Sequence, residues 1–207
     1  MNKLVHSRSR VRKAAGFSMV ELLFVIAIIM VVTGIALVQV SGTLQRAKAD
    51  TALQIVLGQM RVAHERAIDE RRIYRLSFVS PRTIQLDRME LDAGGAYTAV
   101  AQGSIDIPAE TQFTVVSGIP TAATPDSMGV GNRAIDFSID YGGAGTQVFF
   151  QPDGRALDSA NRLNNGVVYM ARPGDLLSSR AVSLFGATGR VKGWFLVMNG
   201  NSPEWRQ

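Results

Sequence analysis

The sequence predicts an α+β fold in which one long N-terminal helix packs on antiparallel β-sheets. The first observation is an apolar run near the N-terminus that continues into an amphipathic stretch without a proline, the pattern of one long helix. The second is that the rest of the chain shows short alternating segments separated by glycine and proline turns. No second long helical pattern follows the first.

Charge separates the first sixteen residues from the rest of the chain. The 207 residues include 22 lysines and arginines and 17 acidic residues, which gives a net charge of +5. Residues 1–16 hold five of the basic residues and no acid, so the remainder is formally neutral. A globally basic nucleic-acid-binding domain is therefore not indicated, whereas a local basic patch is still allowed.

The residue inventory argues against several kinds of chemistry. There is no cysteine, and the two histidines, His6 and His64, are too few for a histidine-rich metal centre. The glycine-rich residues 142–146 lack the lysine of a phosphate-binding loop. Asp136 and Asp140 alternate on a predicted strand, and we interpret them as solvent-facing. We expect no metal, no cofactor and no enzymatic activity.

The N-terminal apolar run has the length of a membrane-spanning helix. Residues 17–40 are nearly all apolar, and a helix needs about 20 residues to cross a ~30 Å hydrocarbon core. The positive charges before the run favour a cytoplasmic location for that end. The run contains one acid, Glu21. A charge costs about 2.5–3.5 kcal/mol at mid-bilayer and less near an interface, so its presence suggests a function.

The order of the N-terminal signals differs from that of an ordinary secretory signal. Such signals place small residues at a cleavage site after the apolar core, whereas here residues 14–16 (AAG) precede it. Residues 16–23 (GFSMVELL) resemble the processing site of type IV prepilins and type II secretion pseudopilins. The resemblance implies cleavage between Gly16 and Phe17 by a prepilin peptidase, followed by N-methylation of Phe17.

The same resemblance implies a role for Glu21 in assembly. In related filaments this glutamate is thought to meet the free N-terminal amine of a neighbouring subunit and so to set the axial register. Two unit charges ~4 Å apart attract by about 4 kcal/mol at an effective dielectric constant near 20, which helps to offset their desolvation. The alternative is that Glu21 only reaches back to the membrane interface.

An amphipathic pattern extends the helix beyond the apolar run, to about Glu70. A helix from Phe17 to this point would be on the order of 80 Å long. One face is apolar and needs a cover, for which the predicted sheets are available. His64 is expected at the surface or boundary of this face, not as a ligand. The apolar residues at helical spacing are Leu53, Val56, Leu57, Met60, Ala63 and Ala67.

Alternating segments predict about seven or eight strands in the remainder. Residues 92–104 and 118–132 are expected to be loops, and residues 152–154 (PDG) form a turn signal because proline fixes φ and glycine accepts a positive φ. The expected strands are 73–78, 83–89, 112–116, 134–140, 147–150, 167–170, 181–185 and 191–197.

Two C-terminal segments carry a second resemblance. Residues 149–154 (FFQPDG) and 186–191 (GATGRV) look like those of the GspH/FimT group of minor pseudopilins and minor pilins. This group implies a type IV pilin-like fold, with the helix packed on two antiparallel sheets. The expected organisation is a cleaved leader at 1–16, a transmembrane or filament-core helix at 17–40, its amphipathic half at 41–71 and a periplasmic β-sheet domain at 72–207.

The resemblance implies a minor pseudopilin of a type II secretion system, in the pseudopilus that drives protein export across the outer membrane. The alternative is a FimT/FimU-type minor pilin of a type IV pilus, in pilus assembly and DNA binding or uptake. Implied partners are other pilins or pseudopilins, the prepilin peptidase, the inner-membrane assembly platform and, before assembly, membrane lipid. The implied location is the inner membrane, with a single pass and a periplasmic C-terminal domain.

A basic segment near the C-terminus carries the DNA-binding alternative. Minor pilins of the FimT type have a Gly-Arg-x-Arg motif, and residues 189–192 (GRVK) correspond to it with lysine in place of the second arginine. Lysine keeps the charge but loses the planar fork. Arg190 and Lys192 are expected on one side of a strand, where phosphate binding would weaken steeply with salt. A solvated hairpin tip is the other interpretation. Candidates to extend the patch are Arg172, Arg180 and Arg206.

Overall fold

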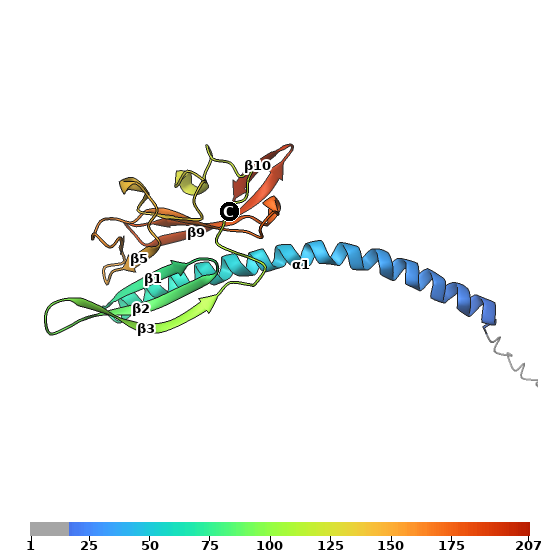
Figure 1. Cartoon of the computed structure of the whole chain (residues 1–207), viewed down its shortest axis with the longest axis horizontal. Coiled ribbons are helices and arrows are strands. Elements are labelled where there is room, and N and C mark those ends of the chain that lie inside the picture. Colours follow the sequence, from blue (N-terminus) through green and yellow to red (C-terminus); the bar gives the residue numbers. More distant parts are fainter. Residues whose placement is uncertain (1–16) are drawn as a thin grey trace, which may run out of the picture. The chain divides into compact units, whose positions relative to one another are not determined.

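A computed structural model describes the chain from residue 17 to residue 207, with the side chains of residues 36–45 excepted. Two compact units are distinguished, Met1–Gly42 and Thr43–Gln207. One α-helix, α1 (Met19–Asp69), occurs in the described residues and contributes to both units. Its bounds confirm the predicted long helix (Figure 1).

The strands all follow α1 and belong to the second unit. Three short 3-10 helices interrupt them: η1 (Pro125–Ser127), η2 (Ile139–Tyr141) and η3 (Leu176–Ser178). The strands are β1 (Ile73–Val79), β2 (Thr83–Leu91), β3 (Tyr97–Asp106), β4 (Ile135–Phe137), β5 (Gln147–Phe150), β6 (Ala156–Leu157), β7 (Gly166–Met170), β8 (Arg180–Phe185), β9 (Arg190–Asn199) and β10 (Ser202–Arg206).

These strands form two five-stranded antiparallel sheets. The first has the order β3-β2-β1-β5-β6 and the second the order β10-β9-β8-β7-β4. The β1–β2 hairpin pairs Ile73 with Met89 and Val79 with Thr83, as its alternation predicts. On its other side β1 pairs with β5, which is distant in sequence. The predicted α+β class, with one helix and antiparallel sheets, is confirmed.

One face of the second half of α1 fills the core of the second unit. The predicted apolar positions of this half are all buried, and Leu53, Val56 and Met60 are fully inaccessible. They share one cluster with side chains of both sheets, including Tyr74 of β1 and Val182 of β8. The helix is therefore held by burial of apolar area, worth about 25 cal/mol per Å².

The largest departure from prediction is β3, which occupies most of a segment expected to be a loop. Every residue of Tyr97–Asp106 is exposed, so the strand lacks the buried alternate positions that reveal a strand in sequence. Its register with β2 also shifts between Leu86 and Asp87, opposite Gln102 and Gly103. The loop prediction for residues 92–104 was wrong for this reason.

Of two further predicted strands, one does not form and the other is shorter than expected. In residues 112–116 only Gln112 forms an isolated bridge, to Ala171. Phe113 is buried, and its ring packs edge-on against Phe78 with 5.6 Å between the ring centroids. The strand predicted at 134–140 ends at Phe137, because the next residue has a left-handed φ of 59° and η2 follows.

Two short strands were not predicted, β6 and β10. The first has only two residues, too few for a period to show, and the second contains a proline, which usually argues against a strand. The predicted loop at 118–132 is confirmed, with η1 inside it.

Candidate functional site

The predicted processing and assembly residues lie at the start of α1. Gly16 is outside the described residues. Phe17 precedes the first helical residue and is 79 % exposed, and the Leu22 N–H donates to the Ser18 carbonyl over 3.1 Å to close the first turn. Glu21 lies in that turn, where the positive end of the helix dipole favours a carboxylate.

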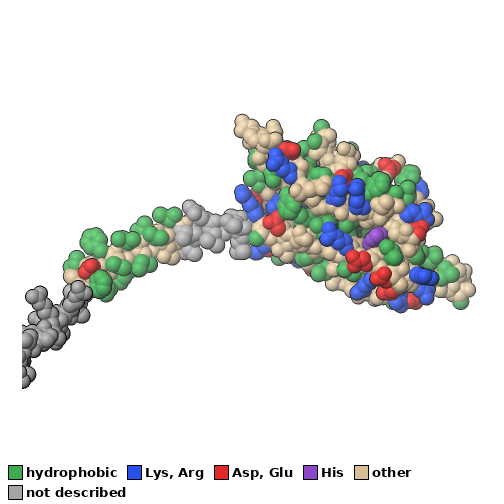
Figure 2. Space-filling model, turned by 180° about the vertical axis from the view of Figure 1, so that it is seen from behind, with side chains coloured by type: hydrophobic (Ala, Val, Ile, Leu, Met, Phe, Trp, Pro, Cys, Tyr) green, Lys and Arg blue, Asp and Glu red, His purple; other side chains and the backbone are tan. Residues whose placement is uncertain are grey.

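Every residue from Met19 to Ile35 is exposed, and all of them except Glu21, Thr33 and Gly34 are hydrophobic. Figure 2 shows hydrophobic side chains along this segment. Five of them line a shallow groove of about 290 Å³ at helical spacing: Phe24, Ala27, Ile28, Val31 and Val32. Among the residues searched, no helix meets the length and apolarity needed to cross a membrane. Part of the predicted 17–40 span, residues 36–40, lies outside the described side chains.

The two predicted basic residues near the C-terminus lie together at the start of β9. Lys192 Nζ forms an ion pair with Asp126 Oδ1 at 2.8 Å, and Asp126 Oδ2 accepts a hydrogen bond from Ser183 Oγ at 2.6 Å. The Arg190 guanidinium lies 5.8 Å from the ring of Phe185. The Asp126 partner was missed in the sequence, because nothing local links residues that far apart along the chain.

The environment of Asp126 lowers its pKa. Burial alone would raise the pKa of this carboxyl, but the hydrogen bonds from Lys192 and Ser183 and the nearby positive charges outweigh burial. Asp126 therefore stays ionised and matches the charge of Lys192. Of the two basic residues, Lys192 is thus in an ion pair, whereas Arg190 has none among the described residues.

Arg180, a suggested extension of the basic patch, is an interior residue. Its side chain is only 7 % exposed, and its Nε lies 2.6 Å from Asp50 Oδ1 of α1. Its Nη1 also donates to two backbone carbonyls. The fold therefore uses Arg180 to tie β8 to the helix, and the suggestion that it joins a surface patch was wrong.

The other two suggested arginines have acidic neighbours. Arg206 lies 3.4 Å from Glu204. A hydrogen bond from Lys48 chiefly, and the charge of Arg172 in part, lower the pKa of Glu110. Arg206 therefore has an acidic partner on its own strand, and Arg172 contributes positive charge near Glu110.

The two C-terminal segments that carry the second resemblance meet at His64 of α1. His64 Nε2 is 2.9 Å from the carbonyl oxygen of Gly154, and its ring lies edge-on to Phe150 at 5.6 Å. Gly189 has a φ of 63°, and a Cβ there would come within 2.6 Å of the His64 ring. Both turns therefore pack on one half-buried histidine, as its predicted boundary position allows.

A second contact joins the same turn to the other sheet. The Ala156 N–H donates to the Gly186 carbonyl at 2.8 Å, and the Gly186 N–H donates to Asn165 Oδ1 at 2.8 Å. The neighbouring Asn164 is fully buried and donates to the Gln147 carbonyl. These contacts give both C-terminal segments a packing role, because they hold the two sheets together.

Asp136 is buried, so its predicted solvent-facing position was wrong. Its Oδ1 accepts a hydrogen bond from the Ala144 N–H at 2.9 Å, and Arg133 Nη1 lies 3.5 Å away. The glycine-rich loop wraps this carboxylate so closely that Gly143 has no room for a Cβ. Burial chiefly, and the Asp136 charge, raise the pKa of Tyr169. The loop is therefore a cap for an aspartate.

No metal site is formed by the described residues, since they contain no group of three or more histidine, aspartate or glutamate side chains placed to hold an ion.

Comparison with known proteins gives one sequence match and one structural likeness. Residues 11–37 match the family model described as the prokaryotic N-terminal methylation motif. No curated protein is significantly similar in sequence. The crystal structure of the type IV minor pilin FimU of Pseudomonas aeruginosa strain PAO1 aligns with a TM-score of 0.44 and 12 % identity, over 72 % of this chain and 89 % of that chain. The motif match confirms the prepilin-type N-terminus that the sequence predicts.

Proposed function

We propose that this chain, which carries a prepilin-type N-terminus, is a minor pseudopilin of a type II secretion system. The observation that carries the proposal is the exposed apolar surface of α1 from Met19 to Ile35, continued by a half that is packed in a β domain. An apolar helix that is exposed all round needs lipid or neighbouring helices as its cover. A filament subunit that starts as a membrane protein meets both needs in turn.

The proposed maturation begins with cleavage between Gly16 and Phe17 by a prepilin peptidase, and N-methylation of Phe17 follows. Removal of the leader takes away the five positive charges that precede the helix. The subunit then rests in the inner membrane by residues 17–40, with its β domain in the periplasm, and the assembly platform adds it to the pseudopilus.

Glu21 is the proposed assembly residue. Four residues separate it from Phe17, a spacing that corresponds to about 6 Å at the helical rise of 1.5 Å per residue once the helix extends back to Phe17. A neighbouring subunit displaced by one helical turn would place its Phe17 amine beside this carboxylate. The attraction of the two charges, about 4 kcal/mol at ~4 Å and a dielectric constant near 20, favours this register over others.

The basic segment gives weaker support to the DNA-binding minor pilin. Its Lys192 is paired with Asp126, and Arg180 is occupied inside the domain. Because each phosphate contact needs a free cation, these pairings reduce the phosphate-binding capacity of this surface. A structural subunit of a secretion pseudopilus needs no such surface, and its function requires no catalytic or metal centre.

The role of Glu21 is tested by replacing it with glutamine in the full-length chain. We expect Glu21→Gln to be cleaved and inserted normally but to be absent from filaments, because glutamine lacks the negative charge that attracts the amine. Glu65→Gln is the matched control, since Glu65 is an exposed glutamate of the other half of α1. The measurements are the mass of the mature N-terminus and the amount of subunit in sheared filaments.

A deletion strain separates the two filament types. Loss of protein export with normal twitching and transformation supports the secretion pseudopilin. Loss of twitching or transformation with normal export would instead assign the chain to a type IV pilus. Normal incorporation of the Glu21→Gln subunit would refute the register role in either system.

A further inference from the structure

The free edge of β3 differs from the other three sheet edges in the described residues. The edge strands β4 and β6 have only three and two residues, and β10 carries a proline and two charged side chains. Short length, proline and charge are the usual protections of a sheet edge against unwanted pairing. β3 has ten residues, all exposed, and from Tyr97 to Ile105 it has neither charge nor proline. Figure 1 shows it at the outer side of its sheet.

The hydrogen-bond pattern of the β2–β3 hairpin shows which groups point outward. The Asp92 N–H donates to the Ala96 carbonyl at 2.8 Å, so this pair is a hydrogen-bonded one. Bonded and non-bonded pairs alternate along an antiparallel ladder. The pairs made by Thr98 and Val100 with β2 are therefore bonded as well. The backbone groups that face away from β2 belong to Tyr97, Ala99 and Ala101.

The pairing-competent part of this edge ends at the register shift. Asp87 of β2 pairs with Ala101, but the next residue of the ladder, Leu86, pairs with Gly103. β3 therefore takes two steps, Gln102 and Gly103, where β2 takes one. Such an irregularity twists the strand and interrupts its ladder. The edge thus offers one uninterrupted row of three outward N–H and C=O pairs, over residues 97–101.

A groove with unpaired positive charge adjoins the Tyr97 end of this row. A cavity of about 300 Å³ is lined by Arg71, Arg72, Leu91, Tyr97 and others. Both arginines are exposed, and among the described residues neither side chain forms an ion pair or hydrogen bond. The groove therefore combines an apolar wall with two cations that have no acidic partner in the described part of the chain.

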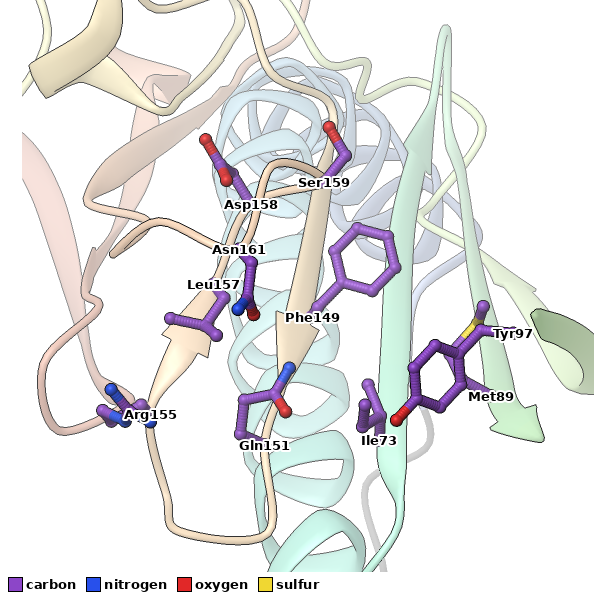
Figure 3. A pocket seen from close by; sticks show the side chains of 10 residues that line it. All are labelled: Ile73, Met89, Tyr97, Phe149, Gln151, Arg155, Leu157, Asp158, Ser159 and Asn161. Carbon is purple, nitrogen blue, oxygen red and sulfur yellow. The ribbon is translucent and has the colours of Figure 1, made fainter. Parts of the chain in front are cut away.

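The same groove extends across the outer face of the sheet. A neighbouring cavity of about 560 Å³ shares Ile73, Met89, Tyr97 and Gln151 with it. Figure 3 shows side chains of β1, β2, β3 and β5 on this face, with Ile73, Met89 and Tyr97 close together. A strand added to β3 would have one row of side chains facing this apolar floor.

We propose that residues 97–101 of β3 accept an extended strand of a partner protein, antiparallel to β3, with acidic residues at its C-terminal end. Backbone pairing to Tyr97, Ala99 and Ala101 supplies the attachment, as in other strand-addition complexes. In this orientation the C-terminal end of the incoming strand lies at Tyr97. Its acids then meet Arg71 and Arg72.

A second copy of this chain fits the site less well than a partner. Antiparallel pairing of two β3 strands brings the copy's residues after Ala101 toward the arginines. The acid there is Asp106, whose Oδ1 already accepts a hydrogen bond from Thr83 Oγ1 at 2.7 Å. The register shift after Ala101 also turns that segment out of the ladder. Asp106 thus lies beyond the regular ladder, so a copy presents its carboxylate to Arg71 and Arg72 less directly than a strand that ends in acids.

Hydrogen exchange of the full-length chain in detergent micelles tests the pairing directly. The probe is the peptide acetyl-TVTVTVEE-amide, with acetyl-TVTVTVKK-amide and acetyl-EETVTVTV-amide as charge and direction controls. We expect the first peptide to protect the amides of Tyr97, Ala99 and Ala101. The amides of Thr98 and Val100, already bonded to β2, should not change. Absence of protection at the three outward amides would overturn the proposal.

Two sets of variants test the backbone and charge contributions, with labelled peptide followed by fluorescence anisotropy. Ala99→Pro removes one outward N–H and leaves the β2 ladder intact, so we expect at least ~10-fold weaker binding, whereas Ala99→Ser retains the N–H and wild-type affinity. Arg71→Ala and Arg72→Ala should each weaken the acidic peptide about two- to fivefold, the range of an exposed ion pair, and leave the lysine peptide unchanged.

The outcomes separate this site from the filament role. Equal binding by Ala99→Pro and Ala99→Ser, or equal affinity for the acidic and lysine peptides, would refute the proposal. Dimerisation of the chain that Ala99→Pro abolishes would assign the edge to a second copy and also refute it. These measurements do not use filaments, so they stand whether or not the chain proves to be a pseudopilin.

Discussion

The two halves of α1 are built from similar apolar residues but have opposite surroundings. Leu23 in the first half is 65 % exposed, whereas Leu53 in the second half is fully buried. The difference is that two sheets of the same chain cover the second half, and no described part of the chain covers the first. Both halves carry apolar surface that is unfavourable in water. In the first half this surface has to be buried by another molecule or by lipid.

The pattern of each half reflects this difference. Around residues 19–35 apolar side chains occur on all sides, as suits a helix surrounded by lipid or other helices. In the second half they keep to one face, and exposed charged residues such as Arg61 and Glu65 lie elsewhere. A helix with apolar side chains on one face fits against a domain core, whereas a helix with apolar side chains on all sides fits in a helix bundle or a membrane.

The same substitution in the two halves should separate them most clearly. Leu53→Ala should lower the free energy of unfolding of the β domain by about 2–5 kcal/mol, because it leaves a cavity in a packed core. Leu23→Ala should leave that free energy unchanged, because Leu23 is exposed. Both free energies are measured by unfolding the full-length chain in detergent, followed by the near-UV circular dichroism of Trp194 and Trp205. Similar losses from the two substitutions would break the comparison.

A smaller effect should show how the turns hold the second half of α1. Gly189 and Gly200 have nearly equal φ values of 63° and 62°, but only Gly189 lies against His64 and the Gly154 carbonyl. Alanine in the left-handed region costs about 1–2 kcal/mol at either site. Overpacking should add about 1–3 kcal/mol at Gly189 alone. Chemical denaturation of the two alanine variants measures the difference, and equal costs would remove the proposed role of the His64 contact.

Features carried by neighbouring residues could be predicted from the sequence. The α1 helix, the β1–β2 hairpin and the buried face that includes Leu53 all follow from local periodicity, and the structure confirms them. The prepilin-type N-terminus is a contiguous motif, and a family match confirms it. The roles of Phe17 and Glu21 in maturation and assembly stay predictions.

Features that depend on distant residues could not be predicted in this way. β3 has no buried face, so its hydropathy resembles that of a loop. Asp136 is charged and alternates with apolar residues, yet a glycine-rich loop later in the chain encloses it. Lys192 belongs to a local basic motif, but its partner Asp126 lies in η1. For Asp136 and Lys192 the deciding neighbour comes from tertiary contact, which local periodicity does not encode, whereas β3 pairs with the adjacent strand β2 and lacks only the buried face.

The smallest expected effect concerns a charge pair, which the described part of the first half of α1 does not have. Asp126→Asn should lower the free energy of unfolding by about 1–2 kcal/mol at pH 7, since its carboxylate accepts hydrogen bonds from Lys192 and Ser183. Because folding lowers the pKa of Asp126, its contribution is complete above the unfolded value of about 3.9. The contribution is then lost as the pH falls through the lower folded pKa.

The difference between wild type and Asp126→Asn should therefore shrink in acid. Urea unfolding of both chains at neutral pH and at a pH of about 2 measures it, and Asp140→Asn is the control because Asp140 is exposed. A difference that persists unchanged in acid would show that Asp126 acts by its shape rather than its charge. The domain would then gain little from the pairing that neutralises Lys192, and the case against a phosphate-binding surface at β9 would weaken with it.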